Sequence, residues 1–547
     1  MLAIRVNEEY LDLNQDVVIS IKFMSPLFNT LGDYSFPFKL PFTSKNKMIL
    51  RFIHRVENTN DKYQFFPADV LWAGVGMLSG SMRIKTAADY YEAVLYIDKG
   101  NFNFQSSKQT LHEMNLGKIV QTSETAAMEY YNDSLTKVYP EVNVAFPLVA
   151  NDLFYGTVAT DEQKAFYNFY FSSVPTGLRD VTDHGDPTIL VPFVYLRFLL
   201  NKAVSLLNYS LDDQFFGQSE ELANLLIYNS RNIDNDQLFG GMYPGTIFYQ
   251  QHMPRVSLNA FIHGLEKYLN CYFFVDDINK IVTIKGAQDI LHSSVVIPFT
   301  EGVTNLAVLI ADQITGAQLA MKPDDGDPAF SDQIQWETGN TIEWTGTVQT
   351  MGDLFIPPYS NIVTAGDVWY VIDVNKYYKA SLGSGQVITW AELTQDITAS
   401  TTFNYRYMSE LITKIETDLS CLYQFTSWEY PSCENKKDDW KKISSRLIFV
   451  TMVDGRIRSA TSNENLSLFF HGPKGLFKKF FQEWINWQLD MAVNVQFSKQ
   501  LSFIDIRDLD FTAKHEIHGN NYLLSEVAVT LTKNTIKPSL IKAFSCL

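Results

Sequence analysis

The sequence predicts a mainly β protein with α/β insertions, divided into several domains. Alternating apolar and polar residues fill most of roughly the first hundred positions and return in about the last fifty. Amphipathic helical patterns occur between these β-rich ends and once near the C-terminus. A chain of 547 residues with 46% hydrophobic and 14% aromatic residues is too long for a single core. About three or four domains are therefore expected.

The first expected domain covers residues 1–175 and consists mostly of strands. The segments 17–25, 68–86 and 90–98 alternate apolar and polar residues or are rich in β-branched residues, with glycine at the turns. A short helix is expected at 124–139, and the proline-containing aromatic stretch after it is typical of an irregular loop. This pattern predicts a β sheet with little helix.

Within this domain, an aromatic arm at about 32–52 reads GDYSFPFKLPFTSKNKMILRF. Pro37 and Pro41 each lack a backbone donor, which favours an edge strand or an extended arm over a central strand. Thr43 or Ser44 then offers an N-cap for a short helix.

The aromatic side chains of this arm need burial, although the prolines discourage ordinary sheet pairing. We expect them to pack across a subunit boundary, where aromatic residues commonly act as anchors. The alternative is that the arm folds back over its own β domain. The candidates for this oligomer interface are Tyr34, Phe36, Phe38 and Phe42.

The next region, residues 176–295, contains a helical pattern followed by β-like segments, and this plan occurs twice. In the second copy Ser257 is an expected N-cap, and the hairpin CYFFVD–DINK–IVTIK follows the helix directly. The repeat predicts duplicated helix-hairpin units whose helices shield one face of a sheet. The apolar stripes are Phe193, Leu196, Leu199, Leu200, Ala203 and Leu206 in the first copy and Leu258, Phe261, Ile262, Leu265 and Leu269 in the second.

Two further β-rich domains are expected, at 296–425 and 426–547. The first has short β segments separated by turns rich in Gly, Asp and Pro. The second has one amphipathic helix at about 475–490, whose aromatic stripe we expect in a core, and the hairpin signal HGNN at 518–521. No low-complexity linker occurs, so the domains are expected to pack closely.

The formal net charge of −17 argues against a surface that holds nucleic acid, because phosphate binding needs clustered Lys and Arg. It leaves open a passage through which DNA moves without specific binding. Charged residues make up only 19% of the chain, which favours a protein that covers much of its surface with partners.

The four cysteines contain no CxxC pair, so neither a disulfide scaffold nor a metal centre is expected. The N-terminal segment lacks an apolar signal core, and the chain has no run of eighteen apolar residues. We therefore expect synthesis in the cytoplasm and no membrane insertion.

Glycine and histidine motifs are better explained by turns than by ligand binding. GVGMLSG at Gly74–Gly80 lacks the GxGxxG spacing and the following helix that phosphate binding requires. HEIH at His515–His518 places its histidines three residues apart on an expected strand, so they point to opposite faces, as in a solvated hairpin.

Acidic motifs likewise identify no catalytic or metal site. DDGD at Asp324–Asp327 lacks the spaced ligands of a calcium loop. The neighbouring carboxylates Asp212/Asp213 and Asp276/Asp277 are typical of turns, and no GxSxG or local Cys/His signature occurs. The sequence therefore predicts no enzyme, with no catalytic, cofactor-binding or metal-binding residues and no cofactor.

Four segments carry a family resemblance, in this order along the chain. They are ISIKFMSPLFNTLGDYSFPFKLPFTSKNKMIL, YPEVNVAFPLVANDLFYG, VSLNAFIHGLEKYLNCYFFVDDINKIVTIKGAQDIL and LSFIDIRDLDFTAKHEIHGNNYLLSEVAVTLTK. Together they resemble the tail hub, or baseplate-hub-like tail-tip proteins, of tailed bacteriophages and prophages of gut bacteria.

The resemblance implies a structural component of the virion tail, made in the host cytoplasm. Hubs of this kind carry two related β-barrel domains with α/β elements inserted between them, and they assemble as a ring, commonly a trimer, that imitates a six-fold tail tube. The implied partners are further copies of the chain, in a trimer or hexamer, and other phage tail proteins. Such a hub joins the tube to tip or receptor-binding proteins and encloses a passage for genome ejection, with DNA present only in transit.

Two other functions stay open at this point. A peripheral receptor-binding or carbohydrate-binding tail protein would expose aromatic platforms, for which Trp369, Trp390 and Trp428 are candidates. A tail-associated cell-wall hydrolase would need convergent carboxylates in a cleft.

Overall fold

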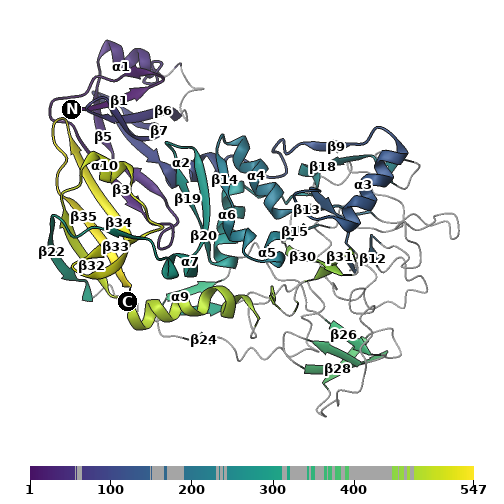
Figure 1. Cartoon of the computed structure of the whole chain (residues 1–547). Helices are drawn as coiled ribbons and strands as arrows, with labels where there is room; N and C mark the ends of the chain where they lie inside the picture. Colours follow the sequence, from purple (N-terminus) through teal and green to yellow (C-terminus); the bar gives the residue numbers. More distant parts are fainter. Residues whose placement is uncertain are drawn as a thin grey trace.

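The computed structural model describes both ends of the chain and most of an α/β region between them (Figure 1). The longer described ranges are 1–55, 65–147, 190–229, 243–254, 256–310, 446–453 and 474–546. Shorter pieces are 57, 149–150, 166–168, 233, 238–239, 317–320, 342–343, 347–350, 362–365, 368–371, 376–382, 388–392, 455–460, 463 and 465–468. These residues form a mainly β protein with α/β insertions, which confirms the predicted fold class.

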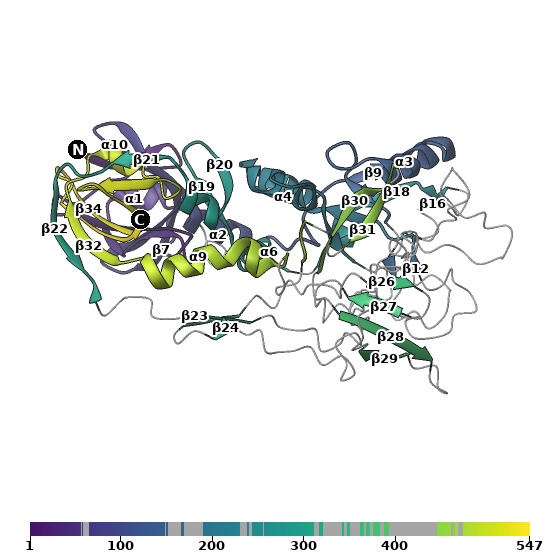
Figure 2. The ribbon, with the colours of Figure 1, turned by 60° about the horizontal axis from the view of Figure 1, so that its bottom comes forward.

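The largest sheet in the described residues has 14 strands and combines both ends of the chain. Its N-terminal and C-terminal parts meet where β3 and β34 pair antiparallel, from Val18 opposite Thr532 to Met24 opposite Glu526. Figure 2 shows how the sheet curls. The order is β2 (Glu9–Tyr10), β1 (Leu2–Val6), β6 (Phe65–Trp72), β7 (Val75–Ala87), β8 (Tyr90–Ile97), β4 (Asp33–Ser35), β3 (Val18–Met24), β34 (Asn520–Thr532), β35 (Ser539–Cys546), β32 (Asn494–Lys499) and β22 (Val303–Val308), with β5 (Phe38–Pro41), β21 (Val296–Pro298) and β33 (Lys514–Ile517) beside it.

Alternation along these strands places one set of side chains inside the curl. In β3, Ile19 and Ile21 are buried, whereas Val18 and Ser20 on the opposite face are at least partly exposed. Val529 of β34 and Ile541 of β35 join the same apolar core. Strands predicted in separate N-terminal and C-terminal domains thus share one sheet and one core.

The aromatic arm becomes β4, β5 and α1 (Ser44–Ile49). Thr43 caps α1, because its side-chain oxygen accepts a hydrogen bond from the backbone N–H of Asn46 at 3.1 Å. Strand β5 pairs with β8, with Phe38 opposite Ala93. The predicted N-cap is confirmed. The expected edge strand or extended arm is corrected for β4, because β4 lies within the sheet between β8 and β3.

The α/β region contains a helix-hairpin in which α6 (Leu258–Leu269) is followed by β19 (Cys271–Asp276) and β20 (Ile281–Gly286). Ser257 caps α6 by accepting from the N–H of Ala260, as the sequence predicts, and Asn270 ends it in the left-handed region with φ 49°. Helices α2 (Asp98–Ser107) and α7 (Ala287–His292) flank this hairpin. The second predicted repeat is therefore present.

The first predicted repeat has its helix, α4 (Leu196–Leu206), but no hairpin. Strand β14 (Ser210–Asp212) pairs in parallel with β20, whereas β15 (Leu225–Tyr228) pairs with β13 (Phe193–Tyr195) and β30 (Arg446–Val453). The short helices η3 (Gln214–Gly217) and α5 (Glu220–Ala223) lie between β14 and β15, and these two strands belong to different sheets. The expected duplication of the hairpin is corrected accordingly.

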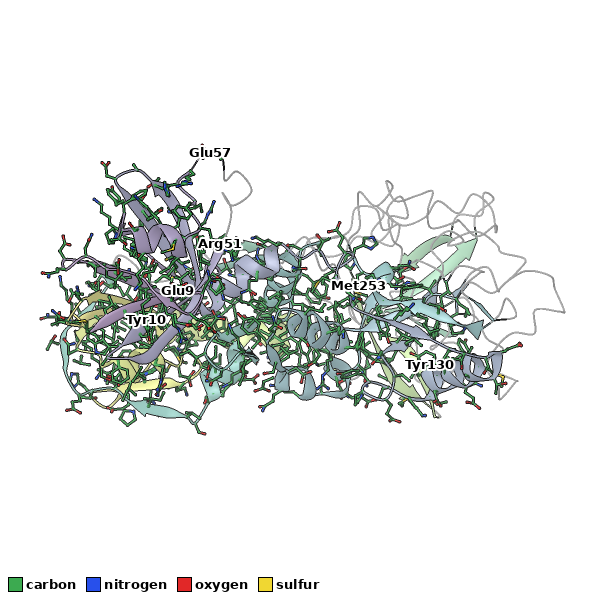
Figure 3. The ribbon with its side chains drawn as sticks, turned by 90° about the horizontal axis from the view of Figure 1, so that it is seen from above. Glu9, Tyr10, Arg51, Glu57, Tyr130 and Met253 are labelled. Carbon is green, nitrogen blue, oxygen red and sulfur yellow. The ribbon has the colours of Figure 1, made fainter. Side chains whose placement is uncertain are left out.

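The sheet that contains β15 has the order β10 (Val144–Ala145), β13, β15, β30 and β31 (Arg456–Ala460). Every residue of β15 is buried, as expected for a strand covered on both faces. Helix α3 (Glu124–Thr136) contacts this sheet and begins after its N-cap, Ser123. Figure 3 shows Tyr130 of α3 and Met253 far from Glu9 and Tyr10 in the large sheet.

The predicted helix at about 475–490 is present as η13 (Phe477–Phe481), α9 (Gln482–Asn486) and η14 (Trp487–Met491). It covers one end of the large sheet and reaches toward α6 (Figure 2). Trp487 Nε1 donates to the carbonyl of Ser545 at 3.0 Å, and Phe28 stacks on Phe544 with centroids 4.7 Å apart. Phe481, Trp484 and Trp487 are buried, and Phe477 and Phe480 pack against the same core partly buried, so the aromatic stripe faces the core, as predicted.

Other described elements are short. The predicted domain at 296–425 contributes strands of which the structure describes only the backbone beyond residue 310, and DDGD and Trp428 lie outside the described residues. No helix in the described part of the chain is long and apolar enough to cross a membrane. The remaining elements are β9 (Lys118–Val120), β11 (Val149–Ala150), β12 (Phe166–Tyr167), β16 (Leu238–Phe239), β17 (Tyr243–Pro244), β18 (Thr246–Phe248), η5 (Tyr249–His252), β23 (Ala317–Ala320), β24 (Ile342–Glu343), β25 (Thr347–Thr350), β26 (Ile362–Ala365), β27 (Val368–Val371), β28 (Lys376–Leu382), β29 (Ile388–Glu392) and α10 (Phe503–Arg507).

Candidate functional site

The four aromatic residues predicted at a subunit interface are divided between the inside and the outside of the sheet. Phe38 is only 3% exposed and belongs to the core of the curled sheet. Phe42 stacks on Tyr91 with centroids 4.4 Å apart and is partly buried against that core. These two side chains fit the alternative in which the arm folds back over its own β domain.

Tyr34 and Phe36 lie on the opposite face. Tyr34 pairs across the strands with Tyr96 on one side and Lys22 on the other. Phe36 is 47% exposed and meets Tyr34 edge to face, with centroids 5.9 Å apart. Of the predicted interface residues, these two are the ones whose side chains a partner could reach.

The reason for the division is a one-residue shift within the arm. Tyr34 in β4 lies opposite Tyr96, and regular antiparallel pairing would then place Phe38 opposite Glu92, but Phe38 in β5 lies opposite Ala93. The extra residue falls at Phe36–Pro37, where the proline has no N–H to donate. The shift moves alternate side chains from the outer face to the core.

A second group of polar residues lies buried where α2 meets α6 and β19, and we call it the charged junction. Its centre is an ion pair of 2.6 Å between Lys99 Nζ and Glu266 Oε1, with side chains only 2% and 4% exposed. Glu266 also accepts hydrogen bonds from the backbone N–H of Phe273 and pairs with His263. Burial acts to raise the pKa of Glu266, but Lys99 and His263 outweigh it, so the pKa lies below its usual range.

The other half of the charged junction holds three carboxyl groups, from Asp33, Asp98 and Asp277. Asp277 accepts hydrogen bonds from the Tyr209 hydroxyl, from Asn101 Nδ2 at 2.8 Å and from the Asp98 backbone N–H at 3.0 Å. Asp98 in turn accepts from the backbone N–H of Asp277 at 2.9 Å. This reciprocal pair links α2 to the turn after β19.

Burial and neighbouring carboxyl groups perturb the pKa values of two of these residues, Asp33 and Asp98. Burial raises the pKa of Asp33 to about 7, with a further contribution from Asp277. Burial also raises the pKa of Asp98 well above its usual value, and Asp33 and Asp277 add to this effect. Burial thus favours the protonated forms of Asp33 and Asp98.

Close backbone contact fixes the junction to the large sheet. A Cβ at Gly32, where φ is +79°, would lie 2.5 Å from the backbone nitrogen of Gly100. A Cβ at Gly100 would overlap the carbonyl of Asp33. Asp33 Oδ1 accepts from the Met24 backbone N–H at 2.6 Å. The sheet and α2 therefore meet through glycine backbone and one buried carboxyl.

The remaining sequence motifs have structural roles in the described residues. Gly74 lies in the turn between β6 and β7 with φ +83°, which explains the glycine. His518 and Gly519, both with positive φ, form the predicted turn between β33 and β34. His515 differs from the expected solvated hairpin, because it is 2% exposed and its Nε2 contacts the carbonyl of Asp510 at 2.9 Å.

Of the paired carboxylates, Asp276 is a turn residue, as the sequence predicts, whereas Asp213 is ion-paired and Asp277 is buried. Asp213 forms a two-point ion pair with Arg197, at 2.7 and 2.9 Å, and Asp276 accepts from the backbone of the turn after it. The sequence pattern does not distinguish Asp276 from Asp277, but in the structure the Asp277 side chain is buried. Among the described residues, no group of three or more His, Cys, Asp or Glu is placed to hold a metal ion.

Comparison with solved structures gives faint structural likenesses, and two of them are to tail proteins. No family model and no curated protein matches the sequence. The 43 kDa tail protein of prophage MuSo2 from Shewanella oneidensis aligns with 6% identity and a TM-score of 0.34, covering 99% of this chain and 95% of that one. The tail protein from Neisseria meningitidis MC58 aligns with 8% identity and a TM-score of 0.27, with the same coverage of 99% and 95%. TM-scores this low do not assign a function to this chain.

Proposed function

We propose that this chain is a structural component of a phage virion tail. In the proposed role it forms an oligomeric hub in the tail, joins the tail tube to tip or receptor-binding proteins, and encloses a passage for DNA. The observation that carries the proposal is the curled sheet built from both ends of the chain, with α/β elements inserted between them. The resemblance to tail hubs implies two β-barrel domains with α/β elements inserted between them. The curled sheet and its inserted elements support the β-rich part of this plan, but strands from both ends of the chain form one sheet rather than two barrels.

Two further features support a structural rather than an enzymatic role. The strongly perturbed carboxyl groups of the charged junction are buried and bonded to neighbouring backbone and side chains, as structural groups are. Phe36 and Tyr34 remain on the outside, where contacts with other tail proteins or with further copies would cover them.

The test is the mass of the purified protein by light scattering, together with negative-stain class averages. A ring of three or six copies with a central hole is the expected result. A monomer at every concentration, combined with binding to host glycans, would contradict the hub and favour a receptor-binding tail protein. Duplex DNA should bind weakly or not at all, because the chain carries a net charge of −17.

A further inference from the structure

The large sheet has an outward surface that the rest of the described chain leaves partly uncovered. We call it the outer face and define it by the outward side chains of β3, β34 and β35 with the adjoining arm residues. Its members are Val18, Ser20, Lys22, Tyr34, Phe36, Glu526, Ala528, Thr530, Thr532, Leu540 and Lys542.

The strand register joins these side chains into one continuous surface. Lys22 lies opposite Tyr34 on one side and Ala528 on the other, and Ala528 lies opposite Leu540. Further along β35 the same face is covered, because Phe544 packs against Trp487 of the C-terminal helix. Phe544 is therefore closed in by the chain itself, whereas Val18, Phe36 and Leu540 of the same face are exposed among the described residues.

The outer face exposes apolar side chains that ordinarily lie in an interior or an interface. Val18 is 46% exposed, Phe36 47% and Leu540 41%, and they come from three neighbouring parts of the sheet. Aromatic and aliphatic residues grouped on one strand surface are typical of a site covered by another protein.

The polar groups of the outer face already bond to one another. Lys22 Nζ pairs with Glu526 at 2.9 Å, and the Ser20 and Thr530 hydroxyls lie 3.3 Å apart. A partner that covers this surface therefore leaves few polar groups without a hydrogen bond, which lowers the free-energy cost of removing water.

The charge of the outer face identifies the partner. Two lysines and one glutamate, Lys22, Lys542 and Glu526, give it a net charge of +1, in a chain whose net charge is −17. Glu526 lies between the lysines, opposite Lys542 in the register. The turn after β34 adds Lys533 and Lys537 at the rim, and Asp16 precedes β3. Because both copies are strongly acidic, their electrostatic repulsion is smallest when one of them contacts the other through its positively charged outer face.

We propose that the outer face binds an acidic surface of a second copy of this chain. This inference deepens the proposed hub function, on which it rests, by naming the surface through which copies meet. Phe36 and Leu540 supply apolar contacts, and the single net positive charge that remains once Lys22 has paired with Glu526, carried by Lys542, complements the neighbouring copy.

The experiment compares two charged substitutions in the full chain. Leu540→Arg places a cation on the β35 side of the outer face, beside Ala528, and Val120→Arg is the matched control on β9, where Val120 is 52% exposed. Light scattering across a concentration series should show that Leu540→Arg raises the dissociation constant about tenfold or more, whereas the control leaves it unchanged. Circular dichroism verifies that both variants fold.

A second pair tests the charge. Lys542→Glu should weaken assembly, and Lys85→Glu, an exposed position on β7, should not. Assembly of Leu540→Arg like the wild type would overturn the inference while leaving the hub intact. A wild-type monomer at every concentration would overturn this inference, and it would overturn the hub as well if the protein also bound host glycans. Binding of duplex DNA that Lys542→Glu abolishes, with no change in mass, would assign the face to an anionic polymer and overturn self-association.

Discussion

The core of the curled sheet and the charged junction bury their side chains in different ways. In the sheet, Ile21, Val529 and Ile541 are at most 1% exposed and bring no polar groups inside. In the junction, Lys99 and Glu266 are 2% and 4% exposed, so a full ion pair is buried there. The apolar core depends on volume, whereas the junction depends on each charge having its partner.

The difference indicates what holds the helix-hairpin against the large sheet. An apolar core tolerates repacking when the total side-chain volume is kept. A buried ion pair is stable only in a geometry that gives each charge its partner and its hydrogen bonds. The junction joins the large sheet to the helix-hairpin through Asp33 on one side and Glu266 on the other. We infer that it sets the orientation of the inserted α/β elements on the sheet.

The largest expected effect comes from breaking the junction. Lys99→Met removes the cation and leaves Glu266 buried without it, so the free energy of unfolding should fall by about 3–5 kcal/mol. Urea denaturation measures this change. Lys137→Met is the matched control, since the Lys137–Asp133 pair is 39% and 48% exposed. The control should lose less than about 1 kcal/mol. Equal losses would show that burial of the pair at Lys99 is unimportant.

A comparable effect is expected in the apolar core. Phe38→Ala removes a buried ring and should lower the free energy of unfolding by about 3–5 kcal/mol. Unlike Lys99→Met, it should do so equally at all pH values where the protein is folded, because no charge is involved. Urea denaturation at two pH values provides the measurement. A loss confined to assembly, with the stability of the monomer unchanged, would contradict the buried position of Phe38.

A smaller effect distinguishes the two interiors by pH. The pKa of Asp33 is raised to about 7, so its stabilising contribution is present in acid and is lost as pH rises through 7. The pKa of Glu266 is lowered, so its contribution is present above the usual glutamate range and is lost only as pH falls below it. Between these limits the junction should be most stable in mildly acidic solution.

The corresponding measurement is the free energy of unfolding at pH 6 and at pH 8. Ionisation of Asp33 should lower the free energy of unfolding by about 1 kcal/mol between pH 6 and pH 8. Asp33→Asn cannot ionise, so the variant should show a decline smaller by that amount. An unchanged decline in the variant would assign the pH dependence to other groups.

The smallest effect on folding is expected outside both interiors. Phe36→Ser changes a ring that is 47% exposed, so the free energy of unfolding should shift by less than about 0.5 kcal/mol. Assembly should nevertheless weaken, which light scattering would show. Comparison of Phe36→Ser with Phe38→Ala distinguishes the role of the exposed ring from that of the buried ring. A large loss of stability in Phe36→Ser would place its ring in the fold rather than in an interface.

The sequence by itself determined the elements with strong local signals. Alternating patterns located β3, β7 and β8, and the hydroxyl side chains of Thr43 and Ser257 located the starts of two helices. These features depend on side-chain period and on capping within a few residues, so a single segment contains the information. The mainly β class with helical insertions followed from the same patterns.

Only the tertiary structure decided which segments meet. The pairing of β3 with β34 joins residues about 500 positions apart, and nothing local specifies it. The extra residue at Phe36–Pro37 turned Phe38 inward and left Phe36 outside, against a regular alternation. The two strands after α4 went to different sheets because their partners lie elsewhere in the chain.

The charged junction was beyond sequence reasoning for the same reason. Lys99, Glu266 and Asp277 come from distant segments and look there like ordinary charged residues of helices and turns. Their burial, and the raised pKa values of Asp33 and Asp98, arise only when α2, α6 and β19 close around them. Periodicity specifies which face of an element is apolar, but partners across a fold are chosen by the complementarity of whole surfaces.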